Sequence, residues 1–285
     1  MRVAVFGDVH GNLPALTAAL ADMDAHSPDV RVCLGDVTMG GAARVPSYGF
    51  RLFCVEIGTA PISTLHVRNP FFSCSLRSDF QVFSTPFNRS PYQVVAALGC
   101  PVVSGNADRQ TLEAPQPLQP RSFPDEQEIH DIGQWSAAQL TETERDTLRS
   151  FVPTVELEDL LCFHGSPARD DEVLDAGTAL ERLAELRAEY GQQSIWIGGH
   201  THQPLLRSLN DWRLLNPGSV GLPFEKRGGK SVNLARAESL LLDWTDGDWA
   251  VTFHRVPYPL APLREGILAS GMPHTRWLAA EWVEG

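Results

Sequence analysis

The sequence lacks three features that mark proteins of membranes, secretory pathways or nucleic acids. Its 285 residues contain no run of about 18 apolar residues, so no membrane-spanning helix is expected. The chain enters directly into the apolar run Val3-Ala4-Val5-Phe6, without a basic and apolar signal segment. A net charge of −12 argues against broad nucleic-acid binding, which draws on dense lysine and arginine.

Disulfide and zinc-thiolate motifs are missing as well. The five cysteines, at positions 33, 54, 74, 100 and 162, are an odd number without a Cys-x-x-Cys spacing. We therefore expect reduced thiols and a cytoplasmic protein with no membrane association. A hydrophobic content of 43% and a charged content of 20% are typical of a globular chain with a sizeable core.

Apolar runs alternate with amphipathic stretches along much of the chain. The pattern predicts strands at 3–6, 30–34, 101–104, 160–163, 194–197 and 213–215, and helices at 13–25, 136–150 and 175–190. Alternating strands and helices indicate an α/β fold with functional loops at the carboxyl edge of its sheet. Residues 239–244 and 249–256 predict a hairpin in a second sheet.

We expect one domain over residues 1–285 with two additions. Residues 44–89 show no clear period and carry five arginines against Glu56 and Asp79, a local net charge of +3. A long segment of this kind is usually a lid, a binding loop or a disordered insert. We expect a poorly ordered basic insertion, with a basic flap over an anionic substrate and a small separate domain as alternatives. A helical extension is expected at about 260–285.

Five short motifs, each following an apolar run, place polar side chains where a loop leaves a strand. They are Gly7-Asp8-Val9-His10-Gly11-Asn12, Leu34-Gly35-Asp36, Ser104-Gly105-Asn106-Ala107-Asp108, Phe163-His164-Gly165-Ser166-Pro167 and Gly198-Gly199-His200-Thr201-His202. Loops at the carboxyl ends of strands can aim such side chains into one shared crevice.

The motifs supply oxygen and nitrogen ligands for a pair of divalent metal ions. Asp8 and His10 are two apart in a turn and can face one ion, while Asp36 can bridge two. The remaining candidate ligands are Asn106, His164, His200 and His202. Two such ions, about 3.5–4 Å apart, can polarise a phosphoryl oxygen and hold a hydroxide as the nucleophile.

Each motif taken singly has an ordinary structural interpretation. Asp36 alone would more often cap a helix, and Asn106 alone would be a turn residue. Seven potential ligands after five strands are hard to explain in this way, so we favour the metal site. The five other histidines, at positions 26, 66, 130, 254 and 274, lack a motif and are expected on the surface or in packing.

Taken together, the motifs resemble the calcineurin-like metallophosphoesterases, and within them the compact bacterial and archaeal phosphodiesterases. The family pattern is Asp-x-His, Gly-Asp, Gly-Asn with a nearby acidic residue, a lone His, and Gly-His-Thr-His. The run Asn216-Pro217-Gly218-Ser219-Val220-Gly221 is similar to an element that these proteins carry after the last motif. The resemblance covers most of the chain outside residues 44–89 and the C-terminal part.

The resemblance implies a four-layer α/β-β/α sandwich of two mixed sheets with the metal ions at the sheet edge. It assigns Asp8, His10, Asp36 and His202 to one ion, and Asp36, Asn106, His164 and His200 to the other. The expected catalytic residues are Asn106, Asp108 and His10, with Asp108 orienting its neighbours. The expected substrate contacts are Asn12, Asn106 and Arg109. Mn²⁺ is the first expectation for the metal, and Fe, Zn, Ni or Mg would also suit these ligands.

The expected activity is hydrolysis of a small phosphodiester or nucleotide by a metal-bridging hydroxide. One position departs from the family, because Ala107 stands where many members have a histidine that protonates the leaving group. Loss of a general acid typically costs about 10²–10⁴ in rate. A low-activity metal-binding scaffold with the same fold therefore stays an alternative. A nuclease that grips a strand with the arginine-rich residues 44–89 is a further alternative. The sequence does not identify the group that replaces this histidine. It does not give the oligomeric state either, so a homo-oligomer stays open.

Overall fold

Two β-sheets form the centre of the molecule. The computed structural model describes residues 1–38, 90–113, 125–228 and 230–285. The expected insertion at about 44–89 lies outside these described residues. None of the helices within the described ranges is long and apolar enough to cross a membrane.

The first sheet has the strand order β10-β9-β1-β2, and β8 and β11 also pair with β9. Its strands are β1 (Arg2–Phe6), β2 (Val30–Cys33), β8 (Phe224–Arg227), β9 (Lys230–Thr245), β10 (Asp248–Pro257) and β11 (Trp282–Glu284). The β1–β2 and β9–β11 pairs are parallel, while β9 runs antiparallel to β1, β8 and β10. This sheet is therefore mixed.

The second sheet has the strand order β3-β4-β5-β7-β6. Its strands are β3 (Thr154–Leu157), β4 (Leu160–Phe163), β5 (Ile195–Ile197), β6 (Leu205–Leu209) and β7 (Trp212–Asn216). The central strands β4, β5 and β7 are parallel, and the edge strands β3 and β6 are antiparallel to their neighbours. The second sheet is mixed too.

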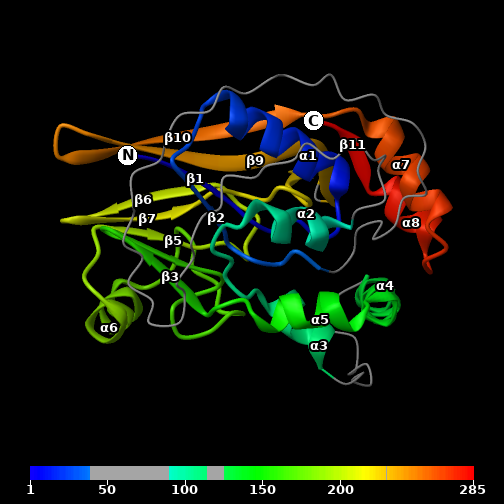
Figure 1. Ribbon diagram of the computed structural model, residues 1–285, viewed down its shortest axis with the longest axis horizontal. Coiled ribbons are helices and arrows are strands. Elements are labelled where there is room, and N and C mark those ends of the chain that lie inside the picture. The colour runs from blue at the N-terminus through cyan, green and yellow to red at the C-terminus, as the bar shows by residue number, and fades with distance from the viewer. Residues whose placement is uncertain (39–89, 114–124, 229) are drawn as a thin grey trace.

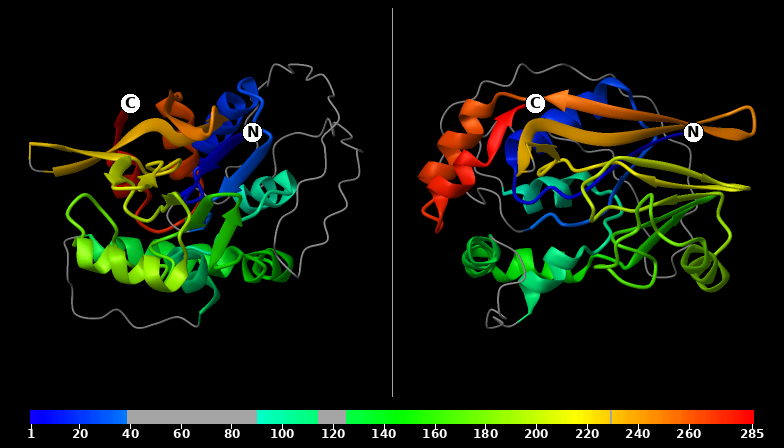
Figure 2. Two further views of the ribbon diagram at one scale, coloured as in Figure 1. Left: turned by 90° about the vertical axis from the view of Figure 1, so that its left-hand side faces the viewer. Right: turned by 180° about the vertical axis from the view of Figure 1, so that it is seen from behind.

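Three separate apolar cores show that the sheets and helices form four layers. Side chains alternate across a strand, so Val3 and Val5 of β1 lie in the core between the two sheets, while Ala4 and Phe6 face the helices beyond the first sheet. In β5, Trp196 faces the core beneath α6. The helices are α1 (Leu13–Ala25), α2 (Pro91–Leu98), α3 (Asn106–Leu112), α4 (Glu126–Gln139), α5 (Glu142–Arg149), α6 (Leu180–Tyr190), α7 (Leu260–Ala269) and α8 (Thr275–Ala280). Figures 1 and 2 show the sheets stacked between α1 and α6, which confirms the expected fold class.

Several predicted elements differ from the structure. The β9–β10 hairpin does not belong to a second sheet, because β9 pairs directly with β1. Residues 101–104 form no full strand, and only Val102 and Val103 make isolated bridges. Helix α6 begins at Leu180, later than the expected residue 175. The segment 260–285 holds α7 and α8 and then returns to the first sheet as β11.

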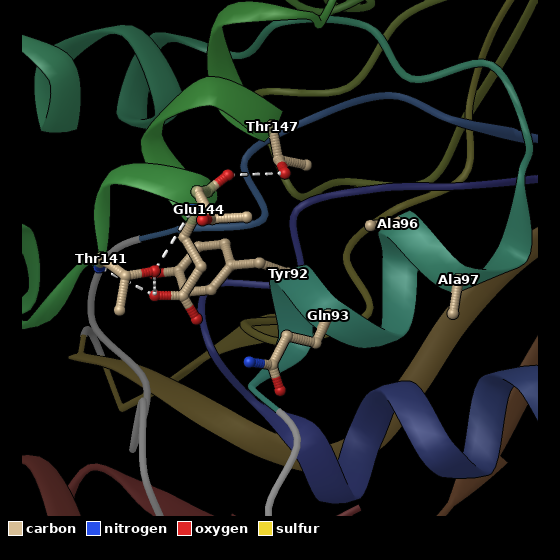
Figure 3. Close-up of a pocket in the computed structure, with 8 residues that line it drawn as sticks. Tyr92, Gln93, Ala96, Ala97, Thr141, Glu144 and Thr147 are labelled. Atoms are coloured by element: carbon tan, nitrogen blue, oxygen red, sulfur yellow. Dashed lines mark hydrogen bonds between the residues drawn. The ribbon is translucent and has the colours of Figure 1, made fainter. Parts of the chain in front are cut away.

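The helix expected at 136–150 is split into α4 and α5 by a capping box. Thr141 Oγ1 accepts a hydrogen bond from the Glu144 backbone N–H at 3.3 Å, and the Thr141 N–H donates to Glu144 Oε2 at 2.9 Å (Figure 3). These bonds satisfy backbone donors that a helix start otherwise leaves unpaired. A cavity of about 420 Å³ lies beside this cap, between α2 and α5, and none of the predicted metal ligands lines it.

We predict that Thr141→Ala lowers the free energy of unfolding by about 1 kcal/mol, because the first turn of α5 loses its side-chain cap. The shift in the denaturation midpoint, at an unchanged slope, measures this change. Thr143→Ala, an exposed threonine inside the same helix, is the matched control and should not destabilise the protein. Equal midpoints for the two variants would contradict a capping role for Thr141.

Candidate metal centre

The predicted ligands come together where the central strands end. Asp8 follows β1, Asp36 follows β2, His164 follows β4, and His200 and His202 follow β5. Asn106 is the first residue of α3, which begins after the short extended segment at Val102 and Val103. Strand ends from both sheets therefore supply one cluster, which runs across the interface between the sheets.

One group of ligands consists of Asp8, His10 and His202. His202 Nε2 lies 3.2 Å from Asp8 Oδ1 and 2.9 Å from His10 Nε2. Asp8 and His10 are buried, whereas His202 is partly exposed. The group is thus shielded from solvent at Asp8 and accessible to solvent at His202.

A second group consists of Asp8, Asp36 and His164. His164 Nε2 lies 3.3 Å from Asp36 Oδ2, 3.9 Å from Asp8 Oδ1 and 3.1 Å from Asn106 Oδ1. Asp36 Oδ2 also lies 3.8 Å from His10 Nε2, so this oxygen faces both groups. Asp36 therefore occupies the position between the groups that a bridging ligand requires.

His200 joins the cluster through its ring and its backbone. Its ring centroid lies 5.4 Å from that of His164, and its N–H donates to Asp8 Oδ1 at 3.2 Å. It belongs to neither of the two tight groups among the described residues. All seven expected ligands are therefore neighbours, with His200 at the margin.

The backbone at the cluster is strained at the ligands themselves. Asp8, His10, Asp36, His200 and His202 have φ angles of 53°, 45°, 48°, 67° and 55°. Residues other than glycine rarely adopt this left-handed region, although Asp and His are enriched among those that do. Each such residue costs of order 1–3 kcal/mol, and such strain concentrates at functional sites. A glycine would relieve the strain but would supply no ligand atom.

Glycines allow the carboxylates to lie tight against the backbone. A Cβ at Gly105 would stand 2.0 Å from Asp36 Oδ1, and one at Gly199 would stand 2.8 Å from Asp8 Oδ2. Any side chain at these positions would displace a carboxylate of the cluster. Contact with the carboxylates therefore explains the glycines at these two positions.

Hydrogen bonds on the outer side of two imidazoles orient their inner nitrogens. His164 Nδ1 lies 2.7 Å from the Leu34 carbonyl oxygen, and His202 Nδ1 lies 3.1 Å from the Leu222 carbonyl oxygen. A carbonyl oxygen only accepts, so both Nδ1 atoms carry protons and both Nε2 atoms face the carboxylates. Metal-bound histidines commonly have such a partner on the other nitrogen.

This arrangement needs a positive charge at its centre. A neutral Nε2 presents an electron pair to a carboxylate oxygen, and two electron-rich atoms at these distances repel each other unless a cation separates them. Asp8 Oδ2 is also buried and has no hydrogen-bond partner within the described part of the chain. Imidazoles, carboxylates and an amide oxygen without a thiolate suit divalent ions of the first transition row. The residues present therefore fit a metal ion.

In the metal-free protein, protonation of His164 supplies the positive charge that the cluster needs. Burial alone would lower its pKa, but the carboxylates of Asp36 and Asp8 outweigh burial and raise the pKa of His164 to about 10. Burial would likewise raise the pKa of Asp36, but His164 and His10 hold it well below its usual range. Burial, with His202 nearby, lowers the pKa of His10 to about 4. The cluster thus holds ionised carboxylates and a cation even in the buried interior.

Asp108 and Asn12 support the loops that carry ligands. Asp108 Oδ1 accepts hydrogen bonds from the N–H groups of Val37 and Thr38, at 3.0 and 3.1 Å, and so holds the turn after Asp36. Burial, together with the charge of Asp36, raises the pKa of Asp108 to about 7.

Asn12 caps α1 by accepting from the Ala15 N–H at 3.1 Å. Its amide nitrogen donates to the Gly221 carbonyl and to the Tyr258 hydroxyl, both at 2.9 Å. Both amide hydrogens of Asn12 are therefore engaged within the protein. Contact between Asn12 and a substrate stays a prediction.

Arg109 connects two of the ligand-bearing segments. Its Nε and Nη2 atoms lie 2.6 and 3.1 Å from the two carboxylate oxygens of Asp170, and Nη1 lies 2.7 Å from Glu113 Oε1. Arg109 follows Asn106 on α3, and Asp170 lies in the loop that starts at His164. The ion pair, which the sequence does not reveal, therefore helps to hold Asn106 against His164. The guanidinium of Arg109, an expected substrate contact, pairs with carboxylates here, and its contact with a substrate stays a prediction.

The loop after β7 supports the cluster from the other side. Ser219 Oγ and the Gly221 N–H both donate to the Asp8 carbonyl oxygen at 2.8 Å. Asn216 Nδ2 donates to the Gly199 carbonyl at 2.6 Å. The Asn-Pro-Gly-Ser run was the sequence signal for this loop, but its role in holding Asp8 and Gly199 required the structure.

We predict that uptake of a divalent metal ion at about pH 8 releases about one proton per chain. The pKa of about 10 keeps His164 protonated at this pH in the metal-free protein, and metal binding requires the neutral imidazole. An ordinary imidazole, with a pKa near 6.5, would already be neutral and release almost nothing. Calorimetric titrations in buffers of different ionisation enthalpy measure the release. Binding heats that do not depend on the buffer would contradict the prediction.

We further predict that Arg109→Ala weakens metal binding by about 10–100-fold, the range seen when residues that orient ligands are removed. The reason is that Asn106 loses its tie to the loop of His164. Arg169→Ala is the matched control, because Arg169 pairs within its own loop, with Asp171 at 2.9 Å. Calorimetry with Mn²⁺ compares the two variants, and equal dissociation constants would exclude a positioning role for Arg109.

Comparisons with known proteins agree with this geometry. The sequence model of the calcineurin-like phosphoesterase superfamily domain matches residues 78–239. A probable metallophosphoesterase from Methanothermobacter thermautotrophicus is 41% identical over 63 residues, which are 22% of this chain. The match spans about a third of that relative's own length, 35%.

Two solved structures share the fold over nearly the whole chain. A metallophosphoesterase from Sphaerobacter thermophilus superposes with a TM-score of 0.62 and 23% identity, over 99% of each chain. A hypothetical protein from Pyrococcus horikoshii OT3 superposes with a TM-score of 0.65 and 16% identity, over 98% of this chain and 96% of the other. The expected resemblance is confirmed, since the family model covers more than half of the sequence. The chain belongs to the calcineurin-like phosphoesterase superfamily.

Proposed function

We propose that the protein is a phosphoesterase that uses two divalent metal ions to hydrolyse a small phosphodiester or a nucleotide. The observation that carries the proposal is the position of Asp36, whose Oδ2 faces His164 at 3.3 Å on one side and His10 at 3.8 Å on the other. A carboxylate in that position joins two sets of ligands into one centre.

The two sets of ligands divide around Asp36. One ion would take Asp8, His10, Asp36 and His202, and the other would take Asp36, Asn106, His164 and His200. Bound there, the ions supply the charge that makes water a nucleophile and neutralises a phosphoryl group. The ligands contain oxygen and nitrogen only, so the site discriminates weakly between metals. We propose Mn²⁺ as the native ion, with Fe, Zn, Ni and Mg as substitutes.

The protein's own side chains would bind and orient the substrate. Asn106 is partly exposed while the carboxylates beneath it are buried, so its amide lies between the cluster and solvent. It can donate to a phosphoryl oxygen whose negative charge grows as water attacks phosphorus and the ester bond breaks. A cavity of about 530 Å³ lies beside the segments that carry Asn106 and His164, and Ser104, Arg109 and Ser166 are among the residues that line it.

Position 107 bears on the choice of substrate. Ala107 is fully buried, and its N–H donates to Asp36 Oδ1 at 2.8 Å, so this residue holds the proposed bridging carboxylate through its backbone. Its methyl group can neither donate a proton nor bind phosphate. We therefore propose esters whose leaving group departs without a general acid, such as activated aryl diesters, rather than unactivated monoesters.

A metal-binding scaffold with little turnover is the second candidate. The buried alanine at position 107 favours it, because the missing proton donor would slow any reaction with a poor leaving group. Purified protein assayed with and without Mn²⁺ on mono- and diesters separates the candidates. Absence of hydrolysis with every metal tested, while the ions still bind, would favour the scaffold.

We predict that Asp36→Asn and His200→Ala each reduce Mn²⁺-dependent hydrolysis of an aryl phosphodiester to background, because each removes a proposed ligand. His130→Ala, which removes an imidazole of α4 outside the cluster, is the control and should leave the rate unchanged. Rates of metal-dependent product release, measured at saturating Mn²⁺, provide the comparison. Full activity in either ligand variant would refute the assignment.

A further inference from the structure

A second group of potential metal ligands lies away from the centre described above. Asp22 and His26 belong to the last turns of α1 and the residue that follows it, and His254 belongs to β10. Each of the three residues offers one ligand atom, and these atoms lie within 4.8 Å of one another. The His26 and His254 rings meet edge to face, with centroids 4.6 Å apart. The sequence carries no motif for this group, and its histidines were expected to be ordinary surface or packing residues.

Rigid elements bring the three side chains together. Asp22 and His26 are four residues apart and therefore lie on one face of α1. Helix α1 packs against β9 and β10 (Figure 1), which places His254 beside this face. The side chains of His254 and Asp22 are only 14% and 24% exposed. The group is thus held between a helix and a strand and is partly shielded from water.

The separations within the group suit a single ion. Ligand atoms about 2.0–2.1 Å from a tetrahedral ion stand about 3.3 Å apart. Asp22 Oδ2 lies 2.8 Å from His254 Nδ1 and 4.0 Å from His26 Nδ1, one separation shorter and one longer than this value. The third separation, between the two imidazoles, is at most 4.8 Å, so each pair of atoms lies within about 1.5 Å of the tetrahedral value.

Binding would rearrange hydrogen bonds that the metal-free group makes. His26 Nδ1 now donates to the Asp22 carbonyl oxygen at 2.8 Å. When Nδ1 becomes a ligand, its proton would move to Nε2 and the ring would turn so that the Nδ1 electron pair points from this carbonyl toward the ion. The proton between His254 Nδ1 and Asp22 Oδ2 would give way to the ion. Two imidazoles and one carboxylate, with water as the fourth ligand, form a common coordination set for zinc and related ions.

The surrounding charges do not oppose a cation. Arg2 lies closest, since its Nη1 donates to the His26 carbonyl at 2.6 Å, but its guanidinium is paired with Asp243 at 2.7 Å. Asp24 on the same helix pairs with Arg31. Each neighbouring arginine is therefore matched by a carboxylate, and Asp22 supplies the negative charge of the site.

We propose that Asp22, His26 and His254 bind one divalent transition-metal ion that prefers imidazole ligands, such as Zn²⁺ or Ni²⁺. The ion fastens the end of α1 to β10. This site is independent of the phosphoesterase centre, because the two groups share no residue. Its role is to stabilise the packing of α1 on the first sheet.

Zn²⁺ bound per chain, measured by equilibrium dialysis and elemental analysis of the full-length protein, tests the proposal. We expect His254→Gln and His26→Gln each to bind one Zn²⁺ fewer than the unaltered protein, and to lose part of the rise in thermal midpoint that Zn²⁺ causes. His274→Gln is the matched control, because His274 pairs with Asp131 at 2.7 Å but belongs to no group of potential metal ligands among the described residues. The control should keep the full number of ions.

The change in Zn²⁺ count caused by His254→Gln can be distinguished from Zn²⁺ binding at the phosphoesterase centre. Asp36→Asn should lower the number of ions bound at that centre and leave unchanged the difference caused by His254→Gln. Glutamine at 254 still offers a donor to Asp22, so the variant keeps the hydrogen bond while removing the imidazole. Equal Zn²⁺ counts and equal stabilisation in the unaltered protein and both histidine variants would overturn the proposal.

Discussion

The structure depends on two buried carboxylates that face imidazole nitrogens across the join between two sheets. Asp8 and Asp36 are almost fully buried, and burial of an ionised carboxylate is strongly unfavourable without a compensating charge. His164, with its pKa raised to about 10, supplies that charge in the metal-free protein, and a metal ion would supply more of it. The cluster therefore favours bound cations, and a metal ion that binds there would replace the proton on His164.

The fold positions these charges through strand ends and strained turns. Parallel strands bring together the loops after β1 and β2 in the first sheet and the loops after β4 and β5 in the second. The packing of the two sheets then brings these two sets of loops together. Five of the ligands adopt left-handed φ angles, and the loop of Ser219 and Gly221 holds the Asp8 backbone from outside. Packing in three separate cores stabilises this strained edge. The cost of local strain is thus offset by burial elsewhere in the sandwich.

The site residues that directly follow strands could be predicted from the sequence. The interactions between segments that share no motif could not. Asp8 and Asp36 follow the parallel strands β1 and β2 of the first sheet, so their meeting follows from strand direction. His164 follows β4 of the second sheet, so its approach to them also depends on how the two sheets pack. The Arg109–Asp170 pair and the group of Asp22, His26 and His254 join residues with no shared motif, and only their packing brings them together. The β9–β10 hairpin is a similar case. The sequence predicts the two strands and their turn, but the pairing of β9 with β1 depends on a contact with the other end of the chain.

The length and position of β9 have a consequence for how the protein forms. This strand pairs with β1, β8, β10 and β11, and its register places Asp243 opposite Arg2, 241 residues away. Contacts between such distant segments slow folding, because a large loop must close before they form. During synthesis β1 cannot pair with β9 until residues 230–245 have been made. Until then one edge of β1 stays open to pairing with other strands. Formation of the loop that carries Asp8 is therefore coupled to the synthesis of β9.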